Sequence, residues 1–220
     1  MQQETNNNIS CHDDNLNTNE RQKCKRRRIV TVAGTAIFAA ISVLLYITKV
    51  PPFVFPIFPL VSFLEINFSE VPALIAGFAY GPLSGFLVLL VRFLVKLPMS
   101  STAFVGEVAD IIYSSSFVLT ATIIYKYRRT FKGALLGLGI AFFAQLLVSS
   151  LANYFVIYHL YNKMFFNGKM ALILSNKYGA FTPQQFILWV IPFNVIKNLI
   201  IGGLTLLVYK RISRFINQFY

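Results

Sequence analysis

Repeated long runs of apolar residues are the feature that most constrains how this chain can fold. Six such runs divide the sequence, at residues 29–47, 68–80, 83–97, 107–125, 133–158 and 186–209. A helix that crosses a hydrocarbon core about 30 Å thick needs roughly 20 predominantly apolar residues, and several of the runs reach that length. Only 13% of all residues are charged, whereas a soluble domain typically carries about 25%. The sequence therefore predicts an all-α integral membrane protein with six transmembrane helices.

Positive charge is concentrated at the ends of these runs. The net charge is +12, and most lysines and arginines fall within residues 21–28, 126–132 and 210–214. Cationic clusters beside transmembrane segments mark the cytoplasmic side of a membrane protein. With six crossings, all three clusters lie on that side and both termini are cytoplasmic. Because the charge lies at membrane boundaries, we expect a lipid bilayer as a partner and no nucleic acid.

The start of the chain differs from the rest in composition. Residues 1–28 are polar, and they delay the first apolar run too far for a secretory signal. No small-residue cleavage site follows that run. We predict a disordered cytoplasmic leader over residues 1–28 and a membrane domain over residues 29–220.

Four prolines interrupt the segment between the first two runs: Pro51, Pro52, Pro56 and Pro59. They exclude a continuous helix until about Asn67. The segment is nevertheless apolar, and non-helical backbone at membrane depth is tolerated only where protein or a water-filled cavity covers its polar groups. We predict a long, partly re-entrant loop on the outer side between the first two helices.

A small set of ionisable side chains lies in or near the apolar runs. Its members are Glu65, Glu70, Arg92, Lys96, Glu107, Asp110 and Lys197. A charge at the centre of a bilayer costs about 2.5 to 3.5 kcal/mol, so such side chains usually face the interior of the helix bundle. Arg92 and Lys96 lie near the outer end of their run and can instead extend to the lipid headgroups.

Amide side chains and one lysine of this polar interior point to a ligand site. The amides are Gln145, Asn153, Asn194 and Asn198. Lys197 follows Asn194 by three positions and shares its helix face, and Asn153 falls at a similar depth in the preceding run. Amide and ammonium groups at one depth suit a neutral, planar, imide-like ligand edge better than an inorganic ion. The alternative is that these groups only bond one another and tie helices together, at about 0.6 kcal/mol per pair.

Glu107 and Asp110 lie one helical turn apart, an arrangement that suits a metal site or an acid and base pair. No histidine lies in that segment, and two carboxylates alone make a weak metal site. We predict no metal, and we expect both residues to accept hydrogen bonds from ligand hydroxyls or to pair with Lys197 or Arg92. The sequence contains no GxxxxGK[ST] loop and no metal-ligand cluster, which agrees with a substrate-binding protein that is not an enzyme and has no nucleotide site of its own.

Four stretches resemble the S components, the substrate-binding subunits, of energy-coupling factor (ECF) vitamin transporters. They read FLEINFSEVPALIAGFAYGPLSGFLVLLVRFLVKL, VGEVADIIYSSSFVLTATIIYKYRRTFKGALLGL, LANYFV and PFNVIKNLIIGGLTLLVYKRIS. The first is of a kind shared by S components for several vitamins, whereas the NYF and PFNxxK segments are typical of the riboflavin-specific members. The resemblance covers most of the chain from about residue 29 onward.

This resemblance implies uptake of riboflavin across a bacterial plasma membrane. In the family, an Asn of the fifth helix and the Asn and Lys of PFNxxK hold the edge of the flavin ring; here they are Asn153, Asn194 and Lys197. The Ala-rich first helix docks against the membrane-embedded T component, which couples two ATP-binding subunits to transport. Ala36 and Ala40 have the small-xxx-small spacing that fits this role. Riboflavin is then the transported ligand and no cofactor is expected; FMN and flavin analogues stay open as further ligands.

One position departs from the family pattern. A segment that often reads GELAN reads GEVAD here, with Asp110 in the Asn position, which leaves open an altered ribityl contact or a related flavin. The predicted substrate-binding residues are Asn153, Asn194, Lys197, Glu107 and Asp110.

Other functions are also open. The chain could be an S component for folate, thiamine or pantothenate, or an intramembrane enzyme that uses Glu107 and Asp110 on a lipid. The enzyme needs these carboxylates where substrate and cosubstrate meet, whereas the predicted topology puts them near the outer face. A proton-driven secondary transporter is a third alternative, and six spans without a visible inverted repeat argue against it.

Overall fold

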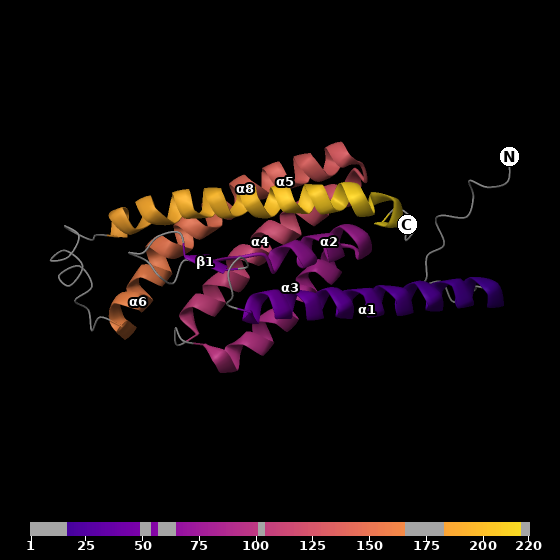
Figure 1. Cartoon of the computed structure of the whole chain (residues 1–220), viewed down its shortest axis with the longest axis horizontal. Coiled ribbons are helices and arrows are strands. Elements are labelled where there is room, and N and C mark those ends of the chain that lie inside the picture. The colour runs from indigo at the N-terminus through magenta and orange to yellow at the C-terminus, as the bar shows by residue number, and fades with distance from the viewer. Residues whose placement is uncertain (1–16, 49–53, 57–64, 101–103, 166–182, 217–220) are drawn as a thin grey trace.

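Seven α-helices make up most of the chain that the structure describes. This computed structural model describes residues 17–48, 54–56, 65–100, 104–165 and 183–216. The helices are α1 (Thr18–Ile47), α2 (Glu70–Tyr80), α3 (Pro82–Lys96), α4 (Val105–Tyr127), α5 (Phe131–Ala152), α6 (Tyr158–Phe165) and α8 (Pro183–Ile216). A 3-10 turn, η1 (Leu97–Met99), follows α3, and a π-helical turn, η2 (Asn153–Ile157), joins α5 to α6. Figure 1 shows one bundle, with α1 and α8 on opposite sides in this view.

Five helical segments of the described chain are long and apolar enough to cross a membrane. They are Thr18–Ile47, Pro82–Met99, Val105–Tyr127, Phe131–Leu160 and Val190–Arg211. The remaining predicted run forms α2, which has 11 residues. At 1.5 Å per residue α2 extends about 16 Å, roughly half of a hydrocarbon core about 30 Å thick. The prediction of a helical membrane protein is therefore confirmed, while α2 is too short to cross alone.

Burial in the bundle follows the pattern expected in lipid. Ile29, Val32 and Leu147 are each more than 60% exposed on the outer surface of their helices. Large apolar side chains in such numbers contact lipid in a membrane protein, since soluble monomers keep apolar patches small. Residues 70–79 of α2 are all buried. The shortest of these predicted runs therefore forms the centre of the bundle.

Helix α1 begins at Thr18, ahead of its predicted start at residue 29. A capping box starts it: Asn17 Oδ1 accepts from the Glu20 backbone N–H at 3.1 Å, and Glu20 Oε2 accepts from the Asn17 backbone N–H at 3.1 Å. Two of the N–H groups that have no partner within the helix are satisfied in this way. The prediction of disorder is therefore wrong for residues 18–28, and residues 1–16 lie outside the described part.

A tight turn at Gly81 joins α2 to α3. Gly81 has φ 104°, a left-handed conformation that favours glycine, and Pro82 begins α3 at a position where its missing N–H costs nothing. The turn falls between the helices predicted at residues 68–80 and 83–97. Gly77 and Gly85 bring the backbones of the hairpin close together, because a Cβ on Gly85 would lie 2.9 Å from the Ala73 carbonyl oxygen.

Two short strands precede α2. The strands β1 (Val54–Pro56) and β2 (Glu65–Asn67) pair antiparallel, with Val54 opposite Asn67 and Pro56 opposite Glu65. The expected all-α fold did not include this pair, although proline excludes a helix and allows extended backbone at a sheet edge. Residues 49–53 and 57–64 lie outside the described part, and so does most of the predicted re-entrant loop.

Candidate functional site

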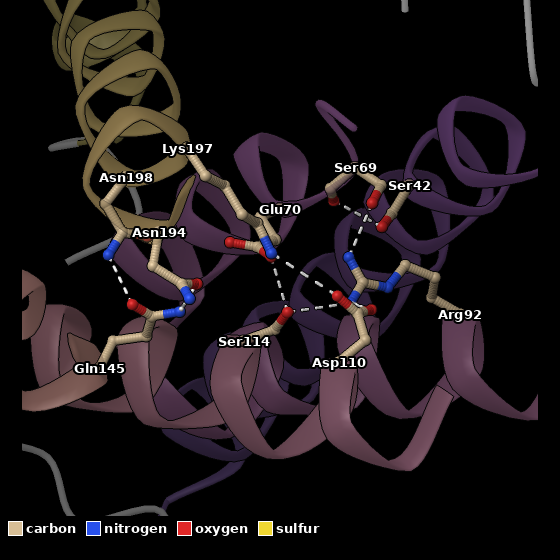
Figure 2. Close-up of polar contacts among 10 residues, drawn as sticks. All are labelled: Ser42, Ser69, Glu70, Arg92, Asp110, Ser114, Gln145, Asn194, Lys197 and Asn198. Carbon is tan, nitrogen blue, oxygen red and sulfur yellow. Dashed lines mark hydrogen bonds and ion pairs between the residues drawn. The ribbon is translucent and has the colours of Figure 1, made fainter. Parts of the chain in front are cut away.

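Polar side chains from six helices or their ends meet in the interior of the bundle (Figure 2). We call this group the polar layer. Its members are Ser42, Ser69, Glu70, Arg92, Asp110, Ser114, Gln145, Asn194, Lys197 and Asn198. All except Asp110 are buried. Polar groups removed from water are costly unless they bond one another, so the partners of each group decide what the layer can do.

Four of these residues form a chain of alternating charge. Lys197 Nζ lies 2.5 Å from Glu70 Oε1 and 3.6 Å from Asp110 Oδ1. Arg92 Nη2 lies 2.6 Å from Asp110 Oδ2. Figure 2 shows the Lys197 side chain extending from α8 toward both carboxylates. Two cations face two anions, so the ammonium of Lys197 can lie in the bundle without an uncompensated charge.

Serine hydroxyls complete the bonding around these charges. Ser114 Oγ donates to Glu70 Oε1 at 2.7 Å and accepts from Arg92 Nη2 at 3.1 Å. Arg92 Nη1 donates to Ser69 Oγ at 2.7 Å, and the Ser69 carbonyl oxygen accepts from Ser42 Oγ at 2.7 Å. The guanidinium is thus held by Ser69, directly before α2, and by Asp110 and Ser114 of α4.

Helix α1 also covers the guanidinium with an aromatic ring. The Tyr46 ring centroid lies 4.7 Å from the Arg92 guanidinium carbon and 5.0 Å from Lys96 Nζ, distances typical of cation–π contacts. Arg92 is 1% exposed. The expectation that Arg92 extends to the headgroups is therefore wrong, because its hydrogen-bond partners lie inside the bundle.

Amides form the second half of the polar layer, between α5 and α8. Gln145 Nε2 donates to Asn194 Oδ1 at 3.0 Å, and Gln145 Oε1 accepts from Asn198 Nδ2 at 2.6 Å. Asn194 Nδ2 donates to the Val190 carbonyl oxygen at 2.9 Å. The predicted pair of Asn194 and Lys197 thus lies where the amides and the charges meet.

Asn153 is buried but bonds within its own helix. It is 4% exposed, and its Nδ2 donates to the Ser149 carbonyl oxygen at 2.7 Å. It is the first residue of the π-helical turn η2, which packs against α8. Such turns are frequent at functional sites. The structure therefore places Asn153 next to the helix that carries Asn194 and Lys197, without a direct bond to either among the described residues.

The structure gives the two predicted carboxylates different surroundings. Asp110 belongs to the charge chain, whereas Glu107 Oε2 accepts from Ser100 Oγ at 2.7 Å, beside the turn that starts α4. Ser100 Oγ also accepts from the backbone N–H of Phe104, whose φ of 69° is left-handed. Among the described residues no group of three or more His, Cys, Asp or Glu could hold a metal ion.

Several members of the polar layer were not predicted as site residues. Glu70 and Arg92 stood out as ionisable residues in apolar runs, and Gln145 as a buried amide, but nothing in their spacing links them to Lys197. Ser69 and Ser114 give no signal at all, because serine is common in transmembrane helices. Only the packing of α2, α3, α4, α5 and α8 brings these groups together.

Comparison with known proteins agrees with this fold. A profile of the family described as "ECF transporter, substrate-specific component" matches residues 30–213. The riboflavin transporter RibU of Staphylococcus aureus is 35% identical over 88% of this chain and 94% of its own length. The riboflavin transporter FmnP of Bacillus subtilis is 28% identical over 85% of this chain and 95% of its own length.

A solved structure shares the architecture as well. It is described as "Structure and mechanism of the S component of a bacterial ECF transporter". It superposes with a TM-score of 0.66 at 33% identity and covers 86% of this chain and 98% of its own. These matches confirm the resemblance found in the sequence, and they describe transporter subunits and not enzymes. The chain belongs to the family of substrate-specific components of ECF transporters.

Proposed function

We propose that this chain is the riboflavin-binding S component of an ECF transporter and delivers riboflavin for uptake into the cell. RibU and FmnP are both named as riboflavin transporters, and each matches at least 85% of this chain. Partner subunits, a T component and two ATP-binding subunits, would supply the energy of transport.

The observation that carries this proposal is the buried Lys197 beside Asn194. The two residues share one face of α8, and Glu70 and Asp110 balance the charge of the ammonium. A lysine in this state can still donate, because the ammonium has three N–H groups. A charge-balanced donor suits the carbonyl oxygens of an uncharged ring such as that of riboflavin.

A titration of the purified protein tests the proposal. The fluorescence of riboflavin should be quenched when it binds to the detergent-purified chain. Folate and thiamine should neither bind nor compete with riboflavin for the site. A yellow chromophore that co-purifies would give the same answer. A protein that binds folate or thiamine and is indifferent to riboflavin would keep the family and refute the substrate.

We further propose a topology of six crossings with both termini in the cytoplasm of a bacterial cell. Figure 1 shows the start of α1 and the end of α8 at the same end of the bundle, which supports an even number of crossings. The five long helices supply five, and α2 with the strand pair before it would supply the sixth. Cationic residues flank that end, at residues 21–28 and 210–211.

The membrane domain is proposed to cover residues 29–220, in keeping with the match over residues 30–213. Helix α1 crosses the boundary at residue 28 without a break. Residues 18–28 would therefore extend α1 into the cytoplasm as a cationic helix.

The docking surface for the T component is proposed to be the outward face of α1. Ala36 and Ala40 are both exposed, and so is Ala33 one turn before Ala36. Small residues at this spacing allow a partner helix to approach closely. Gly34 faces inward, where a Cβ would meet the Tyr80 side chain, so the two faces of α1 serve different contacts.

A further inference from the structure

Three amides of the polar layer form a chain whose hydrogen-bond direction is fixed by one backbone carbonyl. The Val190 carbonyl oxygen can only accept, and it lies 2.9 Å from Asn194 Nδ2. Asn194 therefore turns Oδ1 toward Gln145, whose Nε2 donates to it at 3.0 Å. Gln145 in turn presents Oε1 to Asn198, whose Nδ2 donates at 2.6 Å. Asn198 Oδ1 is the atom left over at the end of this chain.

That oxygen is a buried acceptor without a donor. Asn198 is 2% exposed, and its Oδ1 has no hydrogen-bond partner among the described residues. Native proteins leave few such atoms, because a buried polar atom without a partner loses the hydrogen bonds it makes in water. A bound molecule that donates a proton to Asn198 Oδ1 would remove this loss.

Neighbouring side chains on α8 offer the opposite polarity. Asn194 Nδ2 retains a second hydrogen beyond the one that Val190 accepts, and the Lys197 ammonium has three N–H groups. Asn194, Lys197 and Asn198 lie within two turns of α8, and all three are buried. The site therefore combines donors with one acceptor. The imide edge of a flavin, a carbonyl, an N–H and a carbonyl in sequence, needs two donors and one acceptor.

We propose that Asn198 is a further ligand-binding residue, which accepts a hydrogen bond from the imide N–H of the flavin ring. Gln145 is the positioning residue that turns the Asn198 amide so that its oxygen is left for the ligand. This inference rests on the proposed function, and it adds Asn198 and its positioning residue Gln145 to the predicted set of Asn153, Asn194, Lys197, Glu107 and Asp110.

Binding of riboflavin and of 3-methylriboflavin, which lacks the imide hydrogen, tests the role of Asn198. In the full-length wild type in detergent, the methyl group should raise the Kd about tenfold or more, the effect of losing a hydrogen bond to a buried acceptor. In Asn198→Ala, riboflavin should bind about tenfold more weakly and methylation should add little, because no acceptor remains and the smaller side chain leaves space for the methyl group.

Two further variants separate this role from a structural one. Gln145→Met should also reduce the methylation penalty, because Asn198 can then rotate its amide. Thr205→Val should keep the wild-type penalty, because the Thr205 hydroxyl is buried about two turns farther along α8 and donates to the Ile201 carbonyl oxygen at 2.7 Å.

The outcomes distinguish the inference from the proposed function. A methylation penalty of equal size in wild type and Asn198→Ala overturns the role of Asn198 while riboflavin binding stands. If Asn198→Ala is not monodisperse, Gln145→Met decides, and a penalty equal to that of the wild type overturns the proposal. A wild type that does not bind riboflavin at all refutes the proposed function itself.

Discussion

At the scale of single residues, the charged side chains of the polar layer act as a set. Arg92 and Lys197 oppose Glu70 and Asp110, so the formal charges of the four sum to zero. Removing one partner of a buried ion pair costs about 3–5 kcal/mol, whereas replacing both partners together is often neutral. We therefore expect a single substitution at Lys197 to change the stability of the folded state as well as the proposed ligand binding.

Lys197→Met should lower the stability of the ligand-free protein by about 3–5 kcal/mol, because Glu70 is 1% exposed and loses its cation. Combining it with Glu70→Gln should restore most of the stability, since the remaining charges of Arg92 and Asp110 balance. Thermal unfolding in detergent measures both. A double variant as unstable as the single one would show that charge balance does not stabilise the polar layer. Riboflavin affinity should be reduced in both variants.

Asp110→Asn would restore the residue that the family segment often carries, and here it should destabilise the protein. The substitution leaves Arg92 and Lys197 with Glu70 as their remaining carboxylate in the layer. The loss should be smaller than the roughly 3–5 kcal/mol of a fully buried pair, because 19% of the Asp110 side chain is exposed. Unfolding midpoints of Asp110→Asn and Glu107→Gln compare the two carboxylates, and an unchanged midpoint for Asp110→Asn would contradict the expectation.

The residue types of the site could be predicted from the sequence, but their pairing could not. Ionisable residues in apolar runs can be recognised as site candidates from the sequence, because a charge in the lipid core is costly. Lys197 and Glu70, however, lie on helices far apart in the chain, and the oxygen of Ser114 that bonds Glu70 belongs to an ordinary residue. Partner choice at that separation depends on how α2, α4 and α8 pack.

At the scale of elements, α2 shows how closely the helices of the bundle approach one another. A Cβ on Gly77 would lie 2.3 Å from Thr122 Cγ2 on α4, and one on Gly85 of α3 would lie 2.9 Å from the Ala73 carbonyl oxygen. Glycine at both positions lets α2 lie between its neighbours. This packing fixes Glu70, at the start of α2, opposite Lys197.

Gly77→Ala should therefore destabilise the protein by about 1–3 kcal/mol, the usual cost of overpacking a core. Adding Thr122→Ser should recover part of the loss, because it removes the methyl group in contact and keeps the hydroxyl that donates to the Val118 carbonyl oxygen at 2.6 Å. Gly139→Ala on α5 is the control, since no atom lies within 4 Å of its added Cβ. Equal midpoints for Gly77→Ala and Gly139→Ala would mean that α4 can move away from α2.

The elements themselves could be predicted where their signals are local. Apolar length predicts the helices, and Gly81–Pro82, a pair of residues that favours turns, indicates the turn between α2 and α3. Asn17 and Glu20 also have the spacing of a capping box and could have indicated the early start of α1. The polar composition of residues 1–28 instead led to a prediction of disorder. The strand pair could not be predicted, because its register depends on residues 9 to 13 positions apart across a loop, as in Pro56 with Glu65 and Val54 with Asn67.

At the scale of the whole molecule, α1 connects the polar layer to the proposed docking surface. Its inward side holds Ser42, which donates to the Ser69 carbonyl oxygen, and Tyr46, which covers Arg92. Its outward side exposes Ala36 and Ala40. One helix thus touches the polar layer on one face and exposes small residues to the membrane on the other.

Ala36→Trp should separate these two faces. The indole would project from an exposed position, so riboflavin affinity should stay within about twofold, well under the tenfold that 1.4 kcal/mol represents. Close approach of a T-component helix should be blocked, because packing between membrane helices depends on small residues. Leu147→Trp, which adds the same ring at an exposed site on α5, should leave assembly intact. Co-purification with co-expressed T component and ATP-binding subunits measures the difference, and normal recovery of the Ala36→Trp complex would place the docking surface on another helix.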